Sequence, residues 1–311
     1  MTAPTVTSET ADVESWFPSR WGPGDQAGAL NEITAAKVLE AVSLVRTGAV
    51  HDLAHVLHQD IPAFPGRTFR QYLTTNYHHI NTRSELAGEH GLGRNNVNWI
   101  VEQILATQQM GTHMDGLNHL QVRDQTYNGY RLPDIVEDYG TNKLGVDSLP
   151  QIVTRGILLD IARLRGVAHL EPGDVITVDD ARAAADAAGV SLRRGDAVLF
   201  HTGWGSLWGV DNERYAAGEP GPGVELGRWL AEQRIALTGC DTWSYGAYPP
   251  EDPQQPFVVP QVLNVRHGIV VVENLRLAEA AATGLNEFML VISHAKIRGA
   301  TGVWVCPLAI T

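Results

Sequence analysis

The chain has 311 residues, of which 44% are hydrophobic and 19% are charged, and its formal net charge is −12. This composition is typical of a soluble globular protein with one large or two smaller domains. The acidic balance, without a basic cluster, argues against a nucleic-acid partner and against an anionic membrane surface. No apolar run is long enough for a transmembrane helix. Two distant cysteines, Cys240 and Cys306, give no disulfide framework, and a cytoplasmic location is expected.

The first part of the chain is predicted to be an arm followed by one domain. Residues 1–19 are polar and acidic and lack the basic and apolar regions of a secretory signal, so we expect a flexible N-terminal arm. Residues 20–311 are then expected to form a single domain. Residues 33–47 space their apolar side chains as a helix does, and Gly48 is a plausible stop. Strands and loops predominate from 51 to 130.

Beyond residue 150, single helices alternate with short apolar strands. Helices are predicted over 177–190 and 223–235, and strands over 156–162, within 193–204, over 236–244 and over 268–275. The final segment is interpreted as two strands joined through Gly299–Gly302. Five prolines between 248 and 260 predict a stiff extended loop that can shape a pocket. The alternation predicts an α/β fold with a mixed β-sheet core and flanking helices.

The most informative stretch is QQMGTHMDGLNHL, residues 108–120. On an extended segment, His113 and Asp115 point to the same side, so an imidazole nitrogen and a carboxylate oxygen converge. Mixed nitrogen and oxygen ligands suit Zn²⁺, Mn²⁺ or Fe²⁺. Gly111 permits a sharp backbone turn, through which the amide oxygen of Gln109 can reach the same point.

His119 and Thr112 suggest supporting roles within this motif. His119 stands four residues after Asp115 and can act as a general base or acid beside a metal. Thr112 can hydrogen-bond to a ligand and hold it in place. A histidine two residues before an aspartate is common and usually carries no function. The longer pattern, with its Gly-Thr pair and a later histidine, is much more specific.

The motif GTHMDGLNH resembles the signature of the cyclase family of metal-dependent hydrolases, His-x-Gly-Thr-His-x-Asp-x-x-x-His. That family includes bacterial kynurenine formamidases and isatin hydrolases. The resemblance covers roughly residues 20–311 and implies a swivelling β/β/α-like fold of the longer branch of the family. It also rests on the segments RWGPGDQAGALNEIT, DLAHVLHQDIPAFPG, LFHTGW, GCDTWS, GIVVVENLRL and GATGVWVCPLAI.

The resemblance assigns His113 and Asp115 to metal ligands and His119 to the catalytic histidine. Two further histidines of the formamidases are replaced here by Gln109 and Gln261. We therefore expect a single divalent ion, held by His113, Asp115 and the amide oxygens of the two glutamines. Oxygen-rich ligation favours Mn²⁺, with Zn²⁺ possible. Isatin hydrolase-like members of the family use one Mn²⁺, which agrees.

Other residues are assigned to the neighbourhood of the site. Glu273 ends an apolar strand, and a buried carboxylate needs a partner or a catalytic role. Asp241 can hydrogen-bond to His119 or to metal-bound water, although capping a turn is an equal alternative. Trp243, Trp99 and His55 can line a substrate pocket, and core packing or exposure is the alternative for each.

We therefore expect a metal-dependent hydrolase that cleaves an amide, a cyclic amide or a lactone, in the manner of an arylformamidase or an isatin hydrolase. In this hypothesis His119 moves the proton. We expect a small carbonyl compound as substrate, for which an aromatic one is a candidate, and the family implies a homodimer or homotetramer. Two alternatives stay open: a non-catalytic small-molecule-binding protein that has lost its full metal site, and a metal-dependent cyclase or dehydratase.

Overall fold

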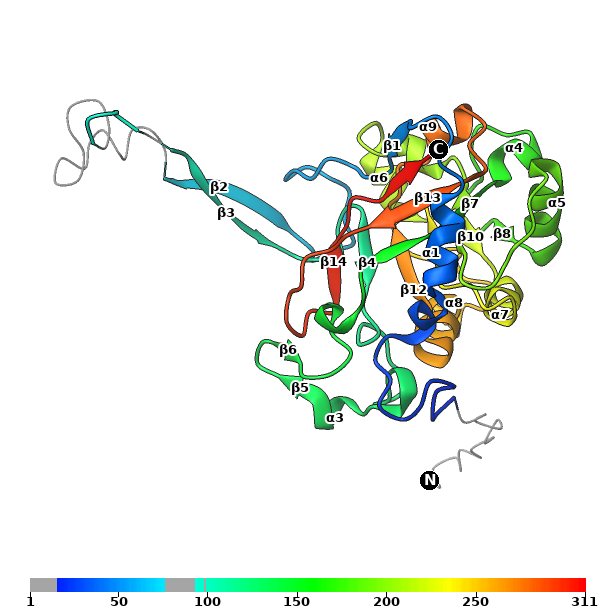
Figure 1. Cartoon of the computed structure of the whole chain (residues 1–311), viewed down its shortest axis with the longest axis horizontal. Coiled ribbons are helices and arrows are strands. Elements are labelled where there is room, and N and C mark those ends of the chain that lie inside the picture. Colours follow the sequence, from blue (N-terminus) through cyan, green and yellow to red (C-terminus); the bar gives the residue numbers. More distant parts are fainter. Residues whose placement is uncertain (1–15, 76–92, 98) are drawn as a thin grey trace, which may run out of the picture.

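The computed structural model describes residues 16–75, 93–97 and 99–311. Within them, a mixed sheet of nine strands runs through the molecule in the order β1-β15-β13-β7-β9-β11-β12-β4-β14 (Figure 1). In this order the strands are Val50–Asp52, Leu308–Ile310, Glu287–Ile292, Ile152–Asp160, Ala197–His201, Leu237–Cys240, Val270–Glu273, His113–Asp115 and Gly302–Trp304. Strands β7, β9, β11 and β12 are parallel, and the remaining pairs are antiparallel. This architecture confirms the predicted α/β class with a mixed sheet.

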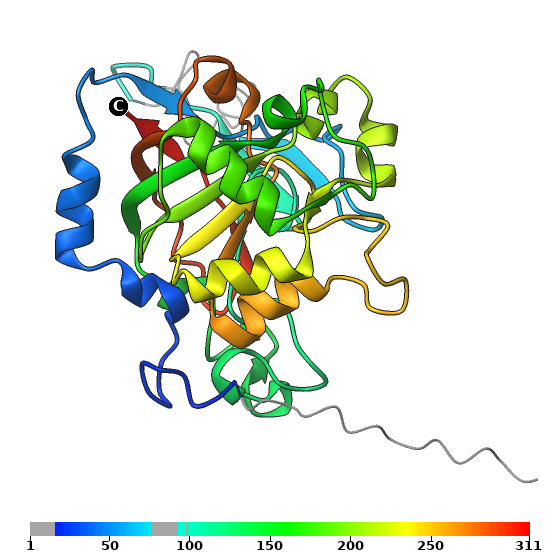
Figure 2. The same ribbon diagram turned by 90° about the vertical axis from the view of Figure 1, so that its right-hand side faces the viewer.

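The helices lie mainly against the parallel strands. Helices α5 and α7 cross one face side by side, with α8 and η5 next to α7 (Figure 2). Apolar side chains of α4, α5 and α7 pack there with Val198, Phe200 and Val271 of the sheet. These helices span Ile161–Arg165 (α4), Val178–Ala188 (α5), Val224–Glu232 (α7), Val258–Pro260 (α8) and Gln261–Arg266 (η5). The opposite face packs against loops and against helix α9, Ala278–Ala282. Helix α1, Ala35–Val42, contacts strands β7 and β13.

Local signals explain where the helices begin and end. Helix α5 starts with a capping box, in which Thr177 and Asp180 bond to each other's backbone, and it stops at Gly189 in the left-handed conformation. Helix α1 starts after Thr34, whose side chain accepts from the N–H of Lys37. Both helices lie within the predicted ranges, although α1 ends five residues before the predicted end at 47.

The C-terminal segment differs from its prediction. It forms three strands instead of two, and β13 and β14 do not pair with each other. Strand β13 pairs with β7, whereas β14 pairs with β4 at the far edge of the sheet. Gly299 therefore lies in a long connection between β13 and β14, and Gly302 is the first residue of β14. A pattern of apolar residues identifies strands but does not reveal which neighbour each strand pairs with.

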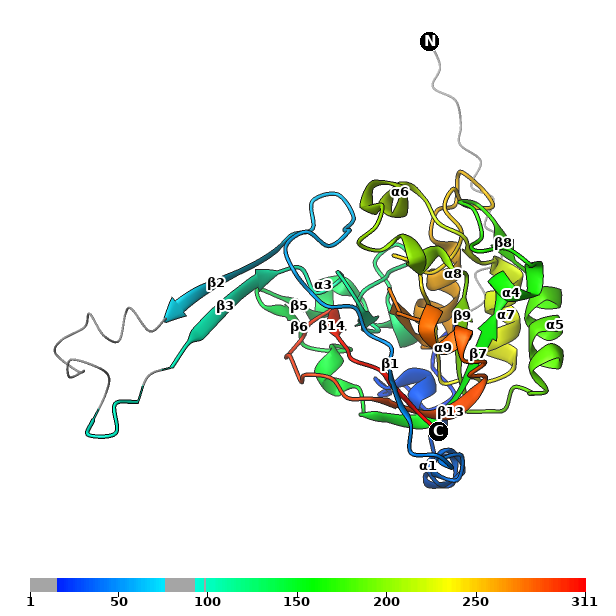
Figure 3. The ribbon, with the colours of Figure 1, turned by 90° about the horizontal axis from the view of Figure 1, so that it is seen from above.

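A two-stranded arm extends from the body of the molecule. Strands β2, Phe69–Thr75, and β3, Val101–Ala106, pair only with each other within the described chain and project outward (Figures 1 and 3). The remaining short elements are β5 Val136–Glu137, β6 Gly140–Thr141, β8 Val175–Ile176, β10 Gly221–Pro222, α3 Leu132–Ile135, α6 Asn212–Ala217, η1 Gly28–Glu32, η2 Tyr127–Gly129, η3 Val146–Ser148 and η4 Trp204–Leu207.

Most of the predicted flexible arm, residues 1–19, lies outside the described residues. In the described part, the N–H of Ser19 donates to Asn128 of the body. None of the helices in the described ranges has the length and apolar content needed to cross a bilayer.

Candidate metal centre

Strand pairing places three side chains in one row on one face of the sheet. In β4, His113 lies directly opposite Glu273 of β12 on one side and Trp304 of β14 on the other. Residues that face each other across antiparallel strands share a side of the sheet. Met114 points the opposite way and is fully buried in the core. The alternation predicted for His113 and Asp115 is therefore present, and the pairing adds Glu273.

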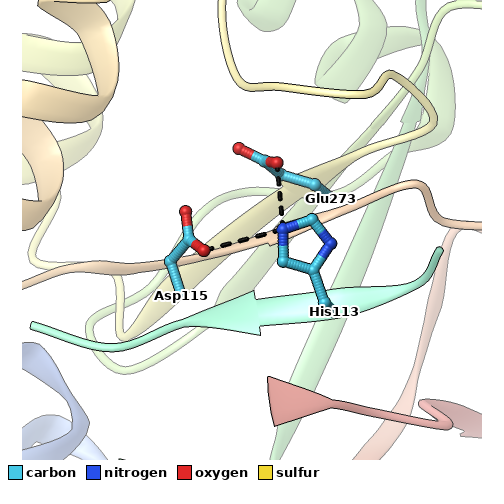
Figure 4. Close-up of side chains that lie close together, drawn as sticks. All are labelled: His113, Asp115 and Glu273. Carbon is cyan, nitrogen blue, oxygen red and sulfur yellow. Dashed lines mark ion pairs between the residues drawn. The ribbon is translucent and has the colours of Figure 1, made fainter. Parts of the chain in front are cut away.

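The ligand atoms of His113, Asp115 and Glu273 converge in a buried cluster. His113 Nε2 lies 3.2 Å from Glu273 Oε2 and 3.6 Å from Asp115 Oδ1 (Figure 4). One potential ligand atom from each residue lies within 4.8 Å of the other two. All three residues are buried, and the exposed fraction of His113 is 0%.

The hydrogen bond of His113 determines which of its nitrogens carries the proton. Nδ1 lies 2.8 Å from the carbonyl oxygen of Gly111, which can only accept, so Nδ1 is the donor. In the neutral ring, Nε2 then carries no proton, and its lone pair faces the two carboxylates. His113 Nε2 and Asp115 Oδ1 are buried without a hydrogen-bond partner. A divalent cation requires converging lone pairs that no N–H or O–H group already occupies. The ligand atoms of this cluster therefore fit a metal ion.

Gly111 makes the orienting hydrogen bond possible. Its φ of +62° lies in the left-handed region, and an added Cβ would lie 2.1 Å from Leu57 Cδ2. A residue with a side chain would be strained and would also displace Leu57. The sharp turn predicted at Gly111 is therefore present, and it presents a carbonyl to His113 Nδ1.

Burial shifts the protonation equilibria of the cluster toward neutral forms. It raises the pKa of Glu273 to about 7, against the opposing charges of His119 and Arg67. Burial likewise raises the pKa of Asp115 and lowers that of His113. Without a metal, burial therefore disfavours the state in which both carboxylates of the cluster are charged.

We expect metal binding to weaken below pH 7, because a cation must displace the proton of Glu273. With one proton displaced, the apparent affinity should fall about tenfold per pH unit below 7 and level off above it. Calorimetric titration in buffers of different ionisation enthalpy counts the released proton. Without metal, the raised pKa means that the folded state binds the proton more tightly than the unfolded state. Stability of the metal-free protein should therefore decline as pH rises from about 4.5 through 7.

Glu273→Gln supplies the control for this pH dependence, because the amide does not titrate. Its metal affinity should be lower at every pH, but the slope due to this proton should disappear. An unchanged slope in the variant would assign the proton to another group.

A second row of residues places Gln109 and His119 beside the cluster. Gly302 lies opposite Asp115 on β14, and an added Cβ there would lie 2.6 Å from Gln109 Nε2. The Gln109 side chain therefore packs over this glycine. Its Nε2 lies 2.9 Å from Thr301 Oγ1 and 3.4 Å from His119 Nδ1. His119 Nε2 in turn lies 3.9 Å from Asp115 Oδ2, and a quarter of the His119 side chain is exposed.

Comparison with known proteins places the fold and the motif in one family. Residues 51–247 match the model of a family described as putative cyclase, which is more than half of the chain. The chain belongs to the cyclase family. Among curated proteins, no significant match was found.

Solved structures of similar fold support the family assignment. A crystal structure described as a novel cyclase has a TM-score of 0.82 and 27% identity, over 94% of this chain and 98% of its own. Isatin hydrolase A from Labrenzia aggregata, bound to benzyl benzoate, has a TM-score of 0.61 and 22% identity, over 86% of this chain and 94% of its own. A predicted metal-dependent hydrolase from Bacillus stearothermophilus has a TM-score of 0.54 and 18% identity, over 85% of this chain and 98% of its own. The last two matches establish similarity of fold.

In this cyclase-family chain, Asp241 is engaged away from the metal cluster. Its carboxylate accepts from the N–H and hydroxyl of Thr202 and from the N–H of Gly203. His201 Nε2 lies 3.9 Å away from it. The turn-capping alternative therefore describes the contacts of Asp241, and the bond to His119 is not among them.

The expected pocket residues fall into two groups. His55 and Trp243 lie among aromatic side chains that include Phe64 and Trp208, and His55 is tied to the motif through its N–H bond to Thr112. Trp99 is different, because it precedes β3 on the projecting arm and is 46% exposed. The structure does not bring Trp99 to the cluster in this chain, since the arm points away from the body (Figure 3).

Gln261 begins helix η5, which the Asn264 side chain ties to the carbonyl of Gly116. The ligand roles of Gln109 and Gln261 stay predictions, and the converging carboxylate is that of Glu273. Sequence reasoning did not single out Trp304 or Arg67. Trp304 could have been found only from the pairing of β14 with β4, and Arg67 only from its bond to the backbone of Gln109.

Proposed function

We propose that this cyclase-family chain is a metal-dependent hydrolase that cleaves an amide, a cyclic amide or a lactone. One observation carries the proposal: the bare Nε2 of His113 and two buried carboxylates converge beside a partly exposed histidine, His119. This combines a cation site with a proton-transfer group that solvent and substrate can reach. A purely structural metal site would have no need of the second feature.

His113, Asp115 and Glu273 would hold the ion. Two carboxylate oxygens and one imidazole nitrogen form a hard ligand set, which favours Mn²⁺, with Zn²⁺ as the second candidate. Such an ion supplies Lewis-acid polarisation of a carbonyl oxygen and lowers the pKa of bound water. The buried carboxylates then need no proton, because the cation compensates their charge.

His119 is the group that we assign to proton transfer. When Gln109 Nε2 donates to its Nδ1, the ring proton sits on Nε2, on the side of Asp115. Release of that contact frees the ring to accept a proton from the attacking water and to return it to the leaving nitrogen or oxygen. Its partial exposure gives the substrate access to the ring.

Similar solved structures support this reaction class. They include an isatin hydrolase and a predicted metal-dependent hydrolase, each with the same fold. Isatin hydrolase, by its name, opens a cyclic amide. The ligand atoms of His113, Asp115 and Glu273 are compatible with open amides and lactones as well. The aryl specificity of an arylformamidase remains part of the proposal.

The test combines metal content with a substrate screen. Plasma mass spectrometry of the purified protein should find about one Mn²⁺ or Zn²⁺ per chain, as expected of one buried three-residue site. The loaded protein should hydrolyse one member of a panel of aryl amides, cyclic amides and lactones, with one ¹⁸O from H₂¹⁸O in the product. A protein that takes up no metal would contradict the proposal. Turnover without ¹⁸O incorporation would favour the cyclase or dehydratase alternative.

A further inference from the structure

Among the described residues, the charge balance around the metal cluster leaves one cation, Arg67, without a counterion. A divalent ion with two carboxylates and a neutral His113 sums to zero charge. Arg67 adds a positive charge nearby, because its Nη1 donates to the backbone oxygen of Gln109, four residues before His113. Within the described part of the chain, no carboxylate forms an ion pair with Arg67. With the metal bound, the guanidinium therefore has no carboxylate partner among the described residues.

Arg67 is held beside the site by its own contacts. Its Nη1 donates to the backbone oxygen of Gln109 at 2.6 Å, and Gln109 is the residue whose side chain contacts His119. One hydrogen bond uses one of five guanidinium N–H groups. The remaining donors are available, and the side chain is only half-buried. A positioned, half-buried arginine of this kind is suited to a carboxylate ligand.

Aromatic rings adjoin the guanidinium. Arg67 Cζ lies 5.4 Å from the ring centroid of Phe64, which in turn lies 5.6 Å from the Trp243 ring. Phe64 is 42% exposed, which is unusual for a phenylalanine that packs against a buried tryptophan. This open ring offers a stacking surface for an aromatic group next to the cation.

A second unused donor lies on the same side of the site. Trp304 lies opposite His113 in the strand pairing, and its Nε1 is buried without an acceptor. Its ring contacts Phe69, two residues after Arg67, at 5.6 Å between centroids. A buried N–H without a partner costs free energy unless a ligand satisfies it.

We propose that Arg67 selects substrates that carry a carboxylate on an aromatic ring next to the scissile amide or ester, with Trp304 as an additional donor to the bound substrate. This inference rests on the proposed hydrolase function and names the substrate class of the same site. The ring stacks on Phe64, and the carboxylate pairs with the guanidinium. In a chain with a net charge of −12, a local cation is required to attract such an anion.

The test compares Arg67→Gln with the wild type on matched substrates. The metal-loaded proteins are assayed with 2-formamidobenzoate, 3-formamidobenzoate and neutral formanilide. Wild type should prefer one of the anionic isomers over formanilide, and Arg67→Gln should reduce that preference by about tenfold or more, mainly through KM. Formanilide hydrolysis should change little. Arg70→Gln, an exposed arginine three residues away, removes the same charge from the surface and should retain the preference.

A binding measurement keeps the inference independent of turnover. Calorimetry of the metal-loaded and metal-free proteins compares benzoate with benzamide, and only wild type and Arg70→Gln should bind benzoate more tightly. Trp304→Phe, which keeps an aromatic ring but removes the donor, should weaken binding of both compounds. If none of the three formamides is hydrolysed, the proposed function fails for this class, and the benzoate preference still decides the role of Arg67.

Three results would overturn the inference. The first is an equal preference in wild type and Arg67→Gln. The second is the same loss in Arg70→Gln, which would indicate general electrostatics. The third is loss of the metal from Arg67→Gln, which would assign the arginine to the charge balance of the cluster.

Discussion

Asp115→Ala should lose the bound metal and with it the hydrolase activity. The substitution removes one of the two carboxylates of the cluster and leaves His113 Nε2 with Glu273 alone. Loss of a group that merely orients a ligand costs about 10–100-fold in metal affinity, so loss of a direct ligand should cost more than about 100-fold. Metal analysis after dialysis and the rate of amide hydrolysis, measured on the same preparation, check this expectation.

The matched control for Asp115→Ala is a carboxylate outside the cluster. Asp241→Asn removes a charge that accepts hydrogen bonds from the turn after β9. The metal should therefore be retained, even if stability falls. Gln109→Ala examines the predicted amide ligand: an unchanged metal content would leave Gln109 with the role of holding His119. Full metal retention in Asp115→Ala would show that the ion binds elsewhere.

The sequence motif predicted His113, Asp115 and His119 together, whereas Glu273 was assigned only to the neighbourhood of the site. His113, Asp115 and His119 are close in sequence, so the period of a strand and a short turn suffice to bring them together. Glu273 comes from a strand 160 residues later, and its place opposite His113 depends on the pairing of β12 with β4. Strand pairing between distant segments is a tertiary property that one sequence does not encode locally.

The fold shows the same division between local and long-range information. Helix α5 was predicted within about two residues, because its capping box and terminal glycine are local signals. The three C-terminal strands were predicted as two, because only three residues separate β14 from β15. In the sheet, however, β14 pairs with β4 and β15 pairs with β1 and β13, near the other end of the strand order. Arg67 has no motif of its own. Its relation to the site arises from a side-chain bond to the backbone of Gln109.

His119→Ala should retain the metal and lose most of the rate. Its ring lies 3.9 Å from Asp115 but is not among the three converging ligands, so metal content should stay near that of the wild type. A positioned general acid or base contributes about 100- to 10,000-fold to the rate, and kcat should fall by that factor with a small change in KM. Steady-state kinetics and metal analysis of the same sample distinguish this variant from Asp115→Ala.

The leaving group makes the role of His119 more specific. If His119 returns the proton to the departing nitrogen, the defect of His119→Ala should be greatest for anilides with poor leaving groups. It should shrink as electron-withdrawing ring substituents make the leaving amine less basic. His119→Gln, which keeps a polar side chain near Gln109 but cannot transfer a proton at neutral pH, should show the same trend. A uniform loss across the anilide series would instead assign His119 to activation of the attacking water alone. Loss of metal in His119→Ala would move this residue into the ligand set and leave the proton transfer to another group.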